Sequence, residues 1–543
     1  MKFFAPTLTA SAFLFLGLYV LYTGHPNEDA YILFNYVNQL SAGNGIVYFE
    51  NGPPTEGATD FLYMVLLSGL TFIGFQVAVG AVLINSLGVF LIHIILQYVF
   101  WDRSMLLPSI AVSLGLGGFI LASPIAASSL VGFSTAFFSA ACIAVFLLTI
   151  TQQYRNFIPY LGLLAGLIRP EGVLIGSISA ALSLFLIEQN ANRRAYFWHC
   201  ITAFILGSFY FIWRWKYFGN TFPLPIYVKS GSGNDIFPGI SDNLSWALNP
   251  ESIILICLAI ISFLFLRNTR KRLLIAWAPF VVWFIVLFFV VQSQNEDERF
   301  QAPLVASLAA STVFAANAFF ERYRNRFSYY ALALLFLILA SPNVKMVVNN
   351  VVRYQNSYID VFPFFLNTYV NQNTRIALTE AGRMAFWLDA HEYDLVGLNH
   401  PQVAREGVTP DFISALNPDI IFIHHSGTWK AGGCAHGPYC HVTAQELRKV
   451  YIRSRHWRNV AYGVKRAPLA VYAYLDNNKS KFDIFQVNYA GSYEHIYAVR
   501  KNGDVTKDEF KTALQKSFSK QKYMSYLELV ARRENADIRE RKD

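Results

Sequence analysis

Residues 4 to 22 read Phe4-Ala-Pro-Thr-Leu-Thr-Ala-Ser-Ala-Phe-Leu-Phe-Leu-Gly-Leu-Tyr-Val-Leu-Tyr22, and His25-Pro-Asn-Glu28-Asp29-Ala-Tyr31 follows shortly after. The first run carries no charge and is long enough to cross a hydrocarbon core of about 30 Å. Glu28 and Asp29 therefore emerge where an apolar helix meets water. On one interpretation they are loop carboxylates at the positive end of a helix expected over 30–42. On the other, a pair fixed against other helices accepts a proton from a substrate hydroxyl.

Composition indicates a polytopic membrane protein. Hydrophobic residues make up 54% of the chain, aromatic residues 16% and charged residues 15%, and the apolar residues come in long runs instead of amphipathic spacing. The net charge of +9 comes mostly from short basic clusters between these runs. This is the pattern of the positive-inside rule, so we expect a lipid bilayer and no nucleic acid as partner. Met1-Lys2-Phe3-Phe4 has little positive charge and no A-x-A cleavage site follows it, which predicts a retained first helix.

Further apolar runs predict the remaining membrane spans. They lie at about 77–100, 106–123, 133–150, 198–213, 252–266, 273–291, 301–320 and 328–341. Basic residues in alternate links mark the cytoplasmic side: Arg193, Arg194, Arg267, Arg270, Lys271, Arg272, Arg322, Arg324 and Arg326. The Glu28-Asp29 loop and everything after residue 342 then lie on the extracytoplasmic face. If the chain is bacterial, the membrane is the cytoplasmic (inner) membrane.

Two apolar stretches are unusual in length. Residues 157–188 would extend ~48 Å as one helix, too long for a single crossing, and Arg169-Pro170-Glu171 lies near their middle. We predict two short helices that meet at this tripeptide. Residues 61–75 are apolar but short and either lie in the interface or re-enter from one face. If they do not span, the chain crosses the membrane eleven times.

The composition changes to that of a soluble domain after about residue 345. We therefore divide the chain into a transmembrane domain, 1–344, and an extracytoplasmic domain, 345–543, which is large enough for its own core. Residues 375–378, 394–398 and 418–423 read as strands with helical patterning between them, so an α/β layer is expected. Residues 526–531 have the spacing of a terminal helix.

The five cysteines divide by location. Cys142, Cys200 and Cys257 lie in or beside apolar spans and are expected to be small core residues. Cys434 and Cys440 flank a glycine-rich loop in the exported domain, where we expect a disulfide. Four histidines lie near this loop, which raises the alternative of zinc: His424, His425, His436 and His441. Their spacing matches no standard zinc pattern, so we assign no metal ligands and expect no cofactor. The sequence leaves open whether the protein requires a divalent metal ion.

Several cations fall at or near the predicted extracytoplasmic ends of spans: Arg169, Arg214, Lys229 and Arg299. Together they could bind an anionic lipid headgroup beside the Glu28-Asp29 pair, whereas each alone could simply extend to the interface. Carboxylates and cations at a lipid interface favour transfer from a lipid phosphate. The cations would hold the leaving phosphate, and one carboxylate would take the proton of the attacking hydroxyl. Glu56 and Glu171 either orient sugar hydroxyls or form structural ion pairs.

The chain also resembles a known family along most of residues 1–425. Three early segments match its opening motifs: Glu28-Asp29-Ala-Tyr31-Ile32, Leu40-Ser-Ala-Gly43-Asn-Gly45-Ile-Val47-Tyr48 and Thr55-Glu56-Gly57-Ala-Thr-Asp-Phe61-Leu62. Later matches are Arg169-Pro170-Glu171-Gly172, Tyr217-Phe218-Gly219-Asn220, Tyr227-Val-Lys229, Arg299-Phe300 and Asp394-Leu-Val-Gly397-Leu398-Asn399-His-Pro401. The set resembles GT-C membrane glycosyltransferases that use polyprenyl-phosphate sugars. Within these it is most similar to the terminal arabinofuranosyltransferases of mycobacterial cell-wall arabinan and their bacterial relatives.

This resemblance implies a GT-C fold with Asp29, and Glu28 close behind it, acting on the acceptor. It implies Arg169, Lys229 and Arg299 at the donor phosphate and Glu56 at the sugar or acceptor. We also expect Tyr31 and Glu171 among the substrate-binding residues. The pair is Glu-Asp where Asp-Asp is usual, and Asn35 stands where relatives often carry Arg. The acceptor would be an envelope glycan, glycolipid or protein.

A second hypothesis is a non-catalytic transporter or envelope assembly factor with an exported sensor domain. Transporters usually show broken helices in both halves and polar residues at the midplane. Here the polar residues gather at one face, which favours the enzyme.

Overall fold

We analysed a computed structural model, which describes residues 2–230, 237–292, 294–323, 326–353, 357–426, 439–453, 462–488, 493–520 and 524–540. The chain forms two compact units. The first contains residues 1–19, 60–216 and 237–352, and the second contains residues 20–59, 217–236 and 353–543. The longest segment of the second unit begins at residue 353, whereas the boundary was expected at 344/345. The second unit also includes the Glu28-Asp29 segment. Helix α16 (Arg326–Arg353) runs across that expected boundary.

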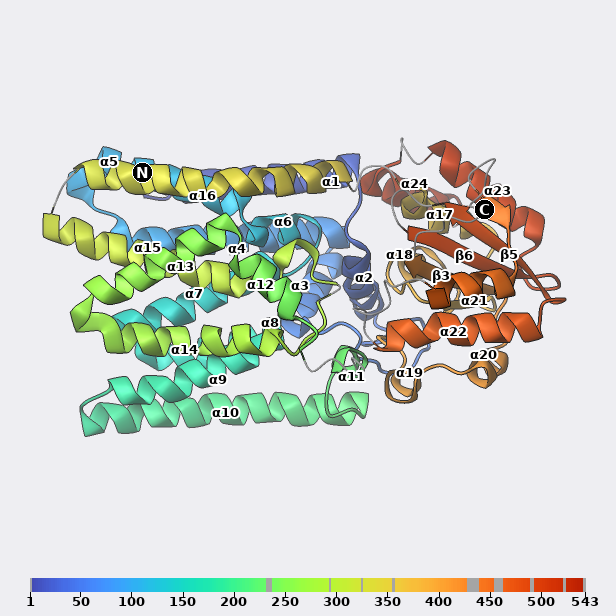
Figure 1. Cartoon of the computed structure of the whole chain (residues 1–543), viewed down its shortest axis with the longest axis horizontal. Coiled ribbons are helices and arrows are strands. Elements are labelled where there is room, and N and C mark those ends of the chain that lie inside the picture. The colour runs from blue at the N-terminus through green and yellow to red at the C-terminus, as the bar shows by residue number, and fades with distance from the viewer. Residues whose placement is uncertain are drawn as a thin grey trace. The chain divides into compact units, whose positions relative to one another are not determined.

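The first unit is a helical bundle whose longer helices run roughly parallel to one another (Figure 1). Its helices are α1 (Phe4–Thr23), α3 (Phe61–Phe72), α4 (Val77–Phe100), α5 (Leu106–Ala122), α6 (Pro124–Leu130), α7 (Thr135–Thr151), α8 (Ile158–Ile168), α9 (Glu171–Ser183), α10 (Asn190–Phe218), α12 (Ile240–Ala247), α13 (Pro250–Phe265), α14 (Arg270–Leu287), α15 (Ala302–Tyr323) and α16. The last four residues of α1 belong to the second unit.

Several of these helices can cross a membrane, as the apolar runs predict. Among the described residues, five helices are long and apolar enough by themselves: Phe4–Thr23, Val77–Phe100, Arg103–Ala122, Asn190–Phe218 and Ala302–Phe320. The pair α12 and α13, bent by 71°, makes a sixth candidate. Shorter apolar helices cover much of the rest, including α3 at the short run 61–75. The chain is a polytopic helical protein, and the number of crossings, eleven, stays a prediction.

The long apolar stretch 157–188 is broken where the sequence predicted. Helix α8 ends at Ile168, Arg169 has extended backbone (φ −146°, ψ 145°), and α9 begins at Glu171. Proline disfavours helical backbone at the residue before it, which accounts for the break at Arg169. The two helices then pack closely because glycines face each other: a Cβ on Gly176 would lie 2.4 Å from the Cα of Gly162.

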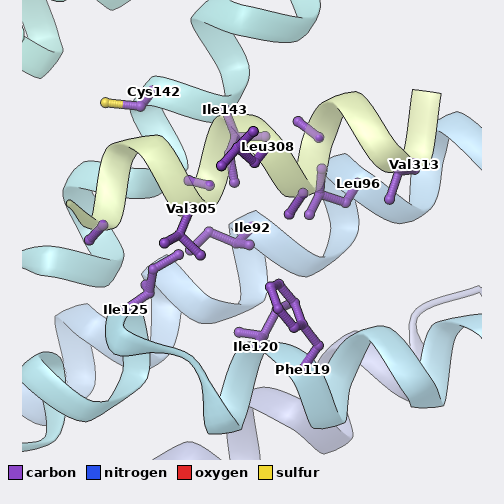
Figure 2. Packing of buried hydrophobic residues seen from close by; sticks show 14 of the residues in the cluster. Ile92, Leu96, Phe119, Ile120, Ile125, Cys142, Ile143, Val305, Leu308 and Val313 are labelled. Carbon is purple, nitrogen blue, oxygen red and sulfur yellow. The ribbon is translucent and has the colours of Figure 1, made fainter. Parts of the chain in front are cut away.

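Buried aliphatic and aromatic side chains fill the centre of the bundle. Figure 2 shows part of this cluster, with Ile92 and Leu96 of α4 packed near residues of α5, α6, α7 and α15. Each of the labelled side chains is buried. The bundle therefore has a continuous interior of its own, as expected of helices that are apolar on most faces.

The second unit is built on one mixed six-stranded sheet of order β2-β1-β3-β6-β5-β4. The strands are β1 (Arg375–Leu378), β2 (His391–Asp394), β3 (Ile420–Ser426), β4 (Tyr439–His441), β5 (Phe482–Asn488) and β6 (Tyr493–Arg500). β1 is parallel to β2 and β3, and the remaining pairs are antiparallel. The expected α/β layer is present, and two of the three expected strands are found close to their predicted places.

Helices cover both faces of this sheet (Figure 1). α20 (Pro410–Leu416), α21 (Ala444–Arg453) and α22 (Tyr462–Asn477) pack on one face over an aliphatic core. The other face is aromatic: Phe422 stacks on Tyr497 at 4.8 Å, and Phe362 of α17 (Tyr358–Leu366) lies 5.3 Å from Tyr497. The remaining helices are α2 (Glu28–Ser41), α11 (Leu224–Ser230), α18 (Arg383–Trp387), α19 (Pro401–Glu406), α23 (Lys507–Lys520) and α24 (Tyr526–Glu540), the last at the predicted terminal helix.

The prediction of a strand over residues 394–398 is wrong. The strand here is β2, which ends at Asp394. The buried Asp394 carboxylate accepts hydrogen bonds from the backbone N–H groups of Val396, Gly397 and Asn399 at 2.8–3.1 Å. Because the side chain takes these donors, they are not available to a sheet partner, and the chain turns with Gly397 at φ +97°.

Candidate functional site

The acidic pair opens helix α2 in the second unit. Asn27 caps the helix, and its side-chain oxygen accepts a hydrogen bond from the Asp29 N–H at 2.9 Å. Glu28 and Asp29 both lie in the first turn, where the helix dipole favours negative charge. Both are half-buried, so the helix presents two carboxylates near, but not fully open to, solvent.

Glu28 is anchored to the loop that follows strand β1. Its Oε1 accepts a hydrogen bond from the Gly382 N–H at 2.7 Å, and its Oε2 accepts one from the Arg383 N–H at 3.1 Å. The Arg383 guanidinium lies 3.4 Å from the same Oε2. Gly382 is the N-cap residue of helix α18 and Arg383 is its first residue, so the Glu28 carboxylate accepts N–H donors at the start of a second helix.

Arg383 links this arrangement to helix α17. Its Nε lies 2.8 Å from Oδ1 of Asp360, and both side chains are buried. Arg383 therefore has a carboxylate on each side, Glu28 and Asp360. This double pairing offsets the buried positive charge and fixes the loop 379–383 against α2 and α17.

The carboxyl groups here have unusual acid strength. The pKa of Glu28 is raised to about 7, chiefly by burial and also by the charge of Glu380, while Arg383 acts in the opposite direction. Burial likewise raises the pKa of Glu380 to about 7, with Asp360 and Asp29 contributing and Arg383 opposing. Near neutral pH these two groups are therefore present in both protonated and ionised forms.

Two histidines adjoin Glu380. His424 Nδ1 lies 3.2 Å from one carboxylate oxygen, and His495 Nε2 lies 3.8 Å from the other. Burial lowers the pKa of His424 to about 4 and lowers that of His495 as well. The potential ligand atoms of Glu380, His424 and His495 all lie within 4.8 Å of one another, so among the described residues these three could hold a metal ion.

Tyr31 and Glu56 occupy the interior of the second unit. Tyr31 is fully buried, with its ring 5.0 Å from that of Phe386 and 6.2 Å from that of Tyr526. These contacts pack Tyr31 against aromatic neighbours, and the substrate contact expected for it stays a prediction. Glu56 is also buried, in a loop whose backbone accepts a hydrogen bond from the Leu224 N–H at 3.2 Å. The loop 55–57 is thereby attached to the start of α11.

In the first unit, Arg169 and Glu171 form a buried ion pair. Arg169 Nε lies 2.6 Å from Glu171 Oε1, and Arg169 Nη1 lies 3.8 Å from Asp60 Oδ2. Asp60 in turn accepts a hydrogen bond from the Ser134 hydroxyl at 2.5 Å. The Arg169 charge is thus already matched by carboxylates, in line with the structural alternative for Glu171.

The other expected cations have different surroundings. Arg299 is buried with its guanidinium 3.9 Å from the centre of the Phe133 ring and 5.3 Å from that of Phe300. Arg214 is buried near the end of α10, 5.7 Å from the Phe211 ring. Both belong to the first unit, whereas Lys229 belongs to the second, near the end of α11. The Lys229 side chain lies outside the described residues.

Four residues of this site were not expected from the sequence: Asp360, Glu380, Arg383 and His495. Thr379-Glu380-Ala381-Gly382-Arg383 directly follows a predicted strand, and polar residues at the carboxyl end of a parallel strand are a usable signal. His495 gave no such signal, because its place beside His424 depends on the pairing of β3 with β6.

The cysteines and the loop histidines are only partly described. Cys440, in β4, is disulfide-bonded, and Cys142, Cys200 and Cys257 are free. Cys434, His436 and the His425 side chain lie outside the described residues, so the Cys434–Cys440 pairing stays a prediction. His441 is on β4, with its ring 4.6 Å from Phe485, away from the cluster of His424.

Comparisons with known proteins identify the fold. A family described as "Domain of unknown function (DUF8728)" matches residues 350–483. No curated protein matches the chain. Among solved structures, ArnT from Cupriavidus metallidurans bound to undecaprenyl phosphate is similar with a TM-score of 0.52 and 12% identity, over 77% of this chain and 92% of that one.

Two further similarities are weaker. ArnT from the same organism in the apo state gives a TM-score of 0.47 at 12% identity, over 77% of this chain and 92% of that one. The Archaeoglobus fulgidus oligosaccharyltransferase in its apo form gives 0.43 at 10% identity, over 90% and 88%. The chain has the GT-C fold of multi-pass membrane proteins, with a small C-terminal domain built on a sheet.

Proposed function

We propose that this protein is a glycosyltransferase that moves a sugar from a polyprenyl-phosphate donor to a hydroxyl of an envelope glycan, glycolipid or protein. The observation that carries the proposal is the position of Glu28 and Asp29, in the first turn of the helix that follows α1, in a chain with the GT-C fold. The similar ArnT structure contains undecaprenyl phosphate. The motif resemblance puts arabinofuranose among the candidate sugars.

The contacts of Glu28 indicate its task in the proposed reaction. Glu28 accepts hydrogen bonds from Gly382 and Arg383 and pairs with the Arg383 guanidinium. We assign it the task of positioning α2 against the loop 379–383. Asp29, one residue further along the same turn, is assigned as the base.

In the proposed step, the acceptor hydroxyl oxygen attacks the anomeric carbon of the donor sugar. The bond from that carbon to the phosphate oxygen breaks, polyprenyl phosphate leaves, and the hydroxyl proton passes to Asp29. Cations stabilise the negative charge on the leaving phosphate. The candidates for this are the four cations expected from the sequence: Arg169, Arg214, Lys229 and Arg299.

The proposal places the chain in the inner membrane of a bacterium, with the acidic pair and the C-terminal domain on the extracytoplasmic face. The orientation is inferred from the basic links between alternate spans, and the bacterial inner membrane from the resemblance to bacterial glycosyltransferases. Membrane vesicles of known orientation would test it, because a donor supplied on one face should be used only when that face carries the Glu28-Asp29 segment.

The direct experiment is transfer of labelled sugar in membranes that contain the chain. A panel of polyprenyl-phosphate sugars, arabinofuranose included, would be offered to the natural chain and to Asp29→Asn and Glu28→Gln. Asp411→Asn is the matched control, because Asp411 is an exposed carboxylate in the first turn of α20 in the same unit. Transfer by the natural chain and the control, lost in Asp29→Asn, supports the assignment.

A further inference from the structure

Three residues whose side chains can bind a metal ion lie close together on the sheet of the second unit. Glu380 follows strand β1, His424 is on β3 and His495 is on β6. His424 and His495 are directly opposite each other in the antiparallel register. Directly opposed residues project from the same face, so the sheet itself brings the two imidazoles together, and their rings are 5.5 Å apart.

Glu380 completes the set from the parallel side of the sheet. The Thr379 N–H donates to the Phe422 carbonyl at 3.1 Å, and the Thr379 hydroxyl accepts from the His424 N–H at 2.8 Å. These bonds hold the start of the 379–383 loop against β3. The glutamate carboxylate consequently spans both histidines, 3.2 Å from His424 Nδ1 and 3.8 Å from His495 Nε2.

We infer that Glu380, His424 and His495 form a binding site for a divalent transition-metal ion of the zinc class. Two imidazoles and one carboxylate are a common ligand set of zinc sites that keep a coordination position open. Ligand atoms around a tetrahedral zinc ion lie roughly 3.2 to 3.5 Å apart. Here one ligand atom from each of the three residues lies within 4.8 Å of the other two, so small side-chain movements bring them to that spacing. Magnesium and calcium prefer oxygen ligands, so two imidazoles disfavour them.

A contact behind one of the three ligands agrees with the same assignment. The Tyr358 hydroxyl lies 2.5 Å from His495 Nδ1, the ring nitrogen that faces away from Glu380. A partner on the outer nitrogen orients the ring and fixes which nitrogen is available to the metal. Tyr358 also contacts the Tyr497 hydroxyl at 3.3 Å, which fixes its own position.

The site can be reached and its local charge permits a cation. The His424 side chain is 32% exposed and that of Glu380 is 14% exposed, whereas His495 is buried. One side is thus accessible to an entering ion and to water in a fourth position. The nearby Arg383 would repel a cation, but Asp360 at 2.8 Å and Glu28 at 3.4 Å already pair with it.

This site differs from the zinc alternative that the sequence raises around Cys434 and Cys440. It shares only His424 with that loop, and its other ligands come from residues 44 positions before and 71 positions after His424. It does not rest on the proposed transfer reaction, because metal binding can be measured without a sugar donor.

The test is zinc titration of the full-length protein, purified in detergent and stripped with a chelator. Isothermal calorimetry and metal analysis should show one zinc ion per chain for the natural protein. Glu380→Gln and His424→Ala should each weaken zinc binding by at least about tenfold, and Tyr358→Phe by about tenfold through the orientation of His495. His391→Ala is the matched control, because His391 is a half-buried strand histidine of the same sheet outside the cluster.

Two results would overturn the inference. One is a natural protein that, after stripping, takes up no zinc beyond the background of a detergent blank. The other is zinc binding by Glu380→Gln and His424→Ala at the natural affinity, which would put the ion on other residues. Melting curves with and without zinc should show a stabilising shift in the natural protein and in His391→Ala, and no such shift in the two ligand variants.

Discussion

The Glu28 carboxylate accepts a hydrogen bond from the backbone N–H of Gly382 at 2.7 Å, although 354 positions separate the two residues in the chain. The contact joins the helix that carries the acidic pair to the loop that carries Glu380 and Arg383. A Cβ added to Gly382 would lie 2.0 Å from the Glu28 carbonyl oxygen and 2.7 Å from Oε1. The close approach therefore requires glycine at position 382.

Gly382→Ala should separate α2 from the 379–383 loop. The clashing Glu28 carbonyl is part of the backbone, so it cannot rotate away as a flexible side chain could, and the two segments must move apart. We expect a loss of about 1–3 kcal/mol in the free energy of unfolding, the usual range for overpacking. Transfer activity should fall with it, because the acidic pair moves. Thermal unfolding in detergent measures the first effect, and sugar transfer measures the second.

Gly69→Ala is the control for this change. Gly69 is inside helix α3, and a Cβ there would meet nothing within 4 Å. The substitution should be neutral or slightly stabilising, since alanine favours a helix over glycine. Equal melting temperatures for Gly382→Ala and Gly69→Ala would contradict the packing described here.

The pKa of Glu28 predicts a pH effect on stability. Burial raises this pKa from its ordinary value of 4.5 to about 7, so folding favours the protonated form. The corresponding stabilisation, about 3 kcal/mol, is complete below about pH 4.5 and is lost as the pH rises through 7. The melting temperature of the natural chain should therefore decline more steeply between pH 5 and 7.5 than that of Glu28→Gln, which cannot ionise. Parallel pH profiles for the two proteins would show that Glu28 does not titrate in this range.

Arg169→Met should destabilise the first unit strongly. It leaves Glu171 and Asp60, both largely buried, without their cation. Breaking a buried ion pair on one side costs about 3–5 kcal/mol, and the protein should accumulate poorly in the membrane. The exposed pair of Arg532 and Glu528 gives the comparison: Arg532→Met should change stability by less than about 0.5 kcal/mol. Normal accumulation and melting of Arg169→Met would argue that the ion pair is not structural.

Local sequence features predicted a large part of the fold. Pro170 and its charged neighbours located the break between α8 and α9, and short apolar runs located β1 and β3. The run 394–398 failed because Asp394 takes backbone donors that a strand would need. A side chain that competes with the sheet is hard to detect from apolar pattern alone.

Only the part of the candidate site on helix α2 could be predicted from the sequence. Glu28 and Asp29 follow the first apolar helix and could be found by position. Glu380, Arg383 and His495 come together through strand pairing and the loop after β1, which are contacts between distant parts of the chain. No local pattern in the sequence encodes which strands become neighbours.

Asp29 is proposed to take the acceptor proton in a sugar transfer from a polyprenyl-phosphate donor. The most direct measurement is the rate of labelled-sugar transfer by Asp29→Asn beside the natural chain and Asp411→Asn, at equal amounts of folded protein in the membrane. We predict transfer by the natural chain and the control, and a loss of about 10²–10⁴-fold in Asp29→Asn, the range for removal of a general base. Unchanged transfer by Asp29→Asn, or no transfer by the natural chain from any donor with acceptor envelope supplied, would contradict the claim.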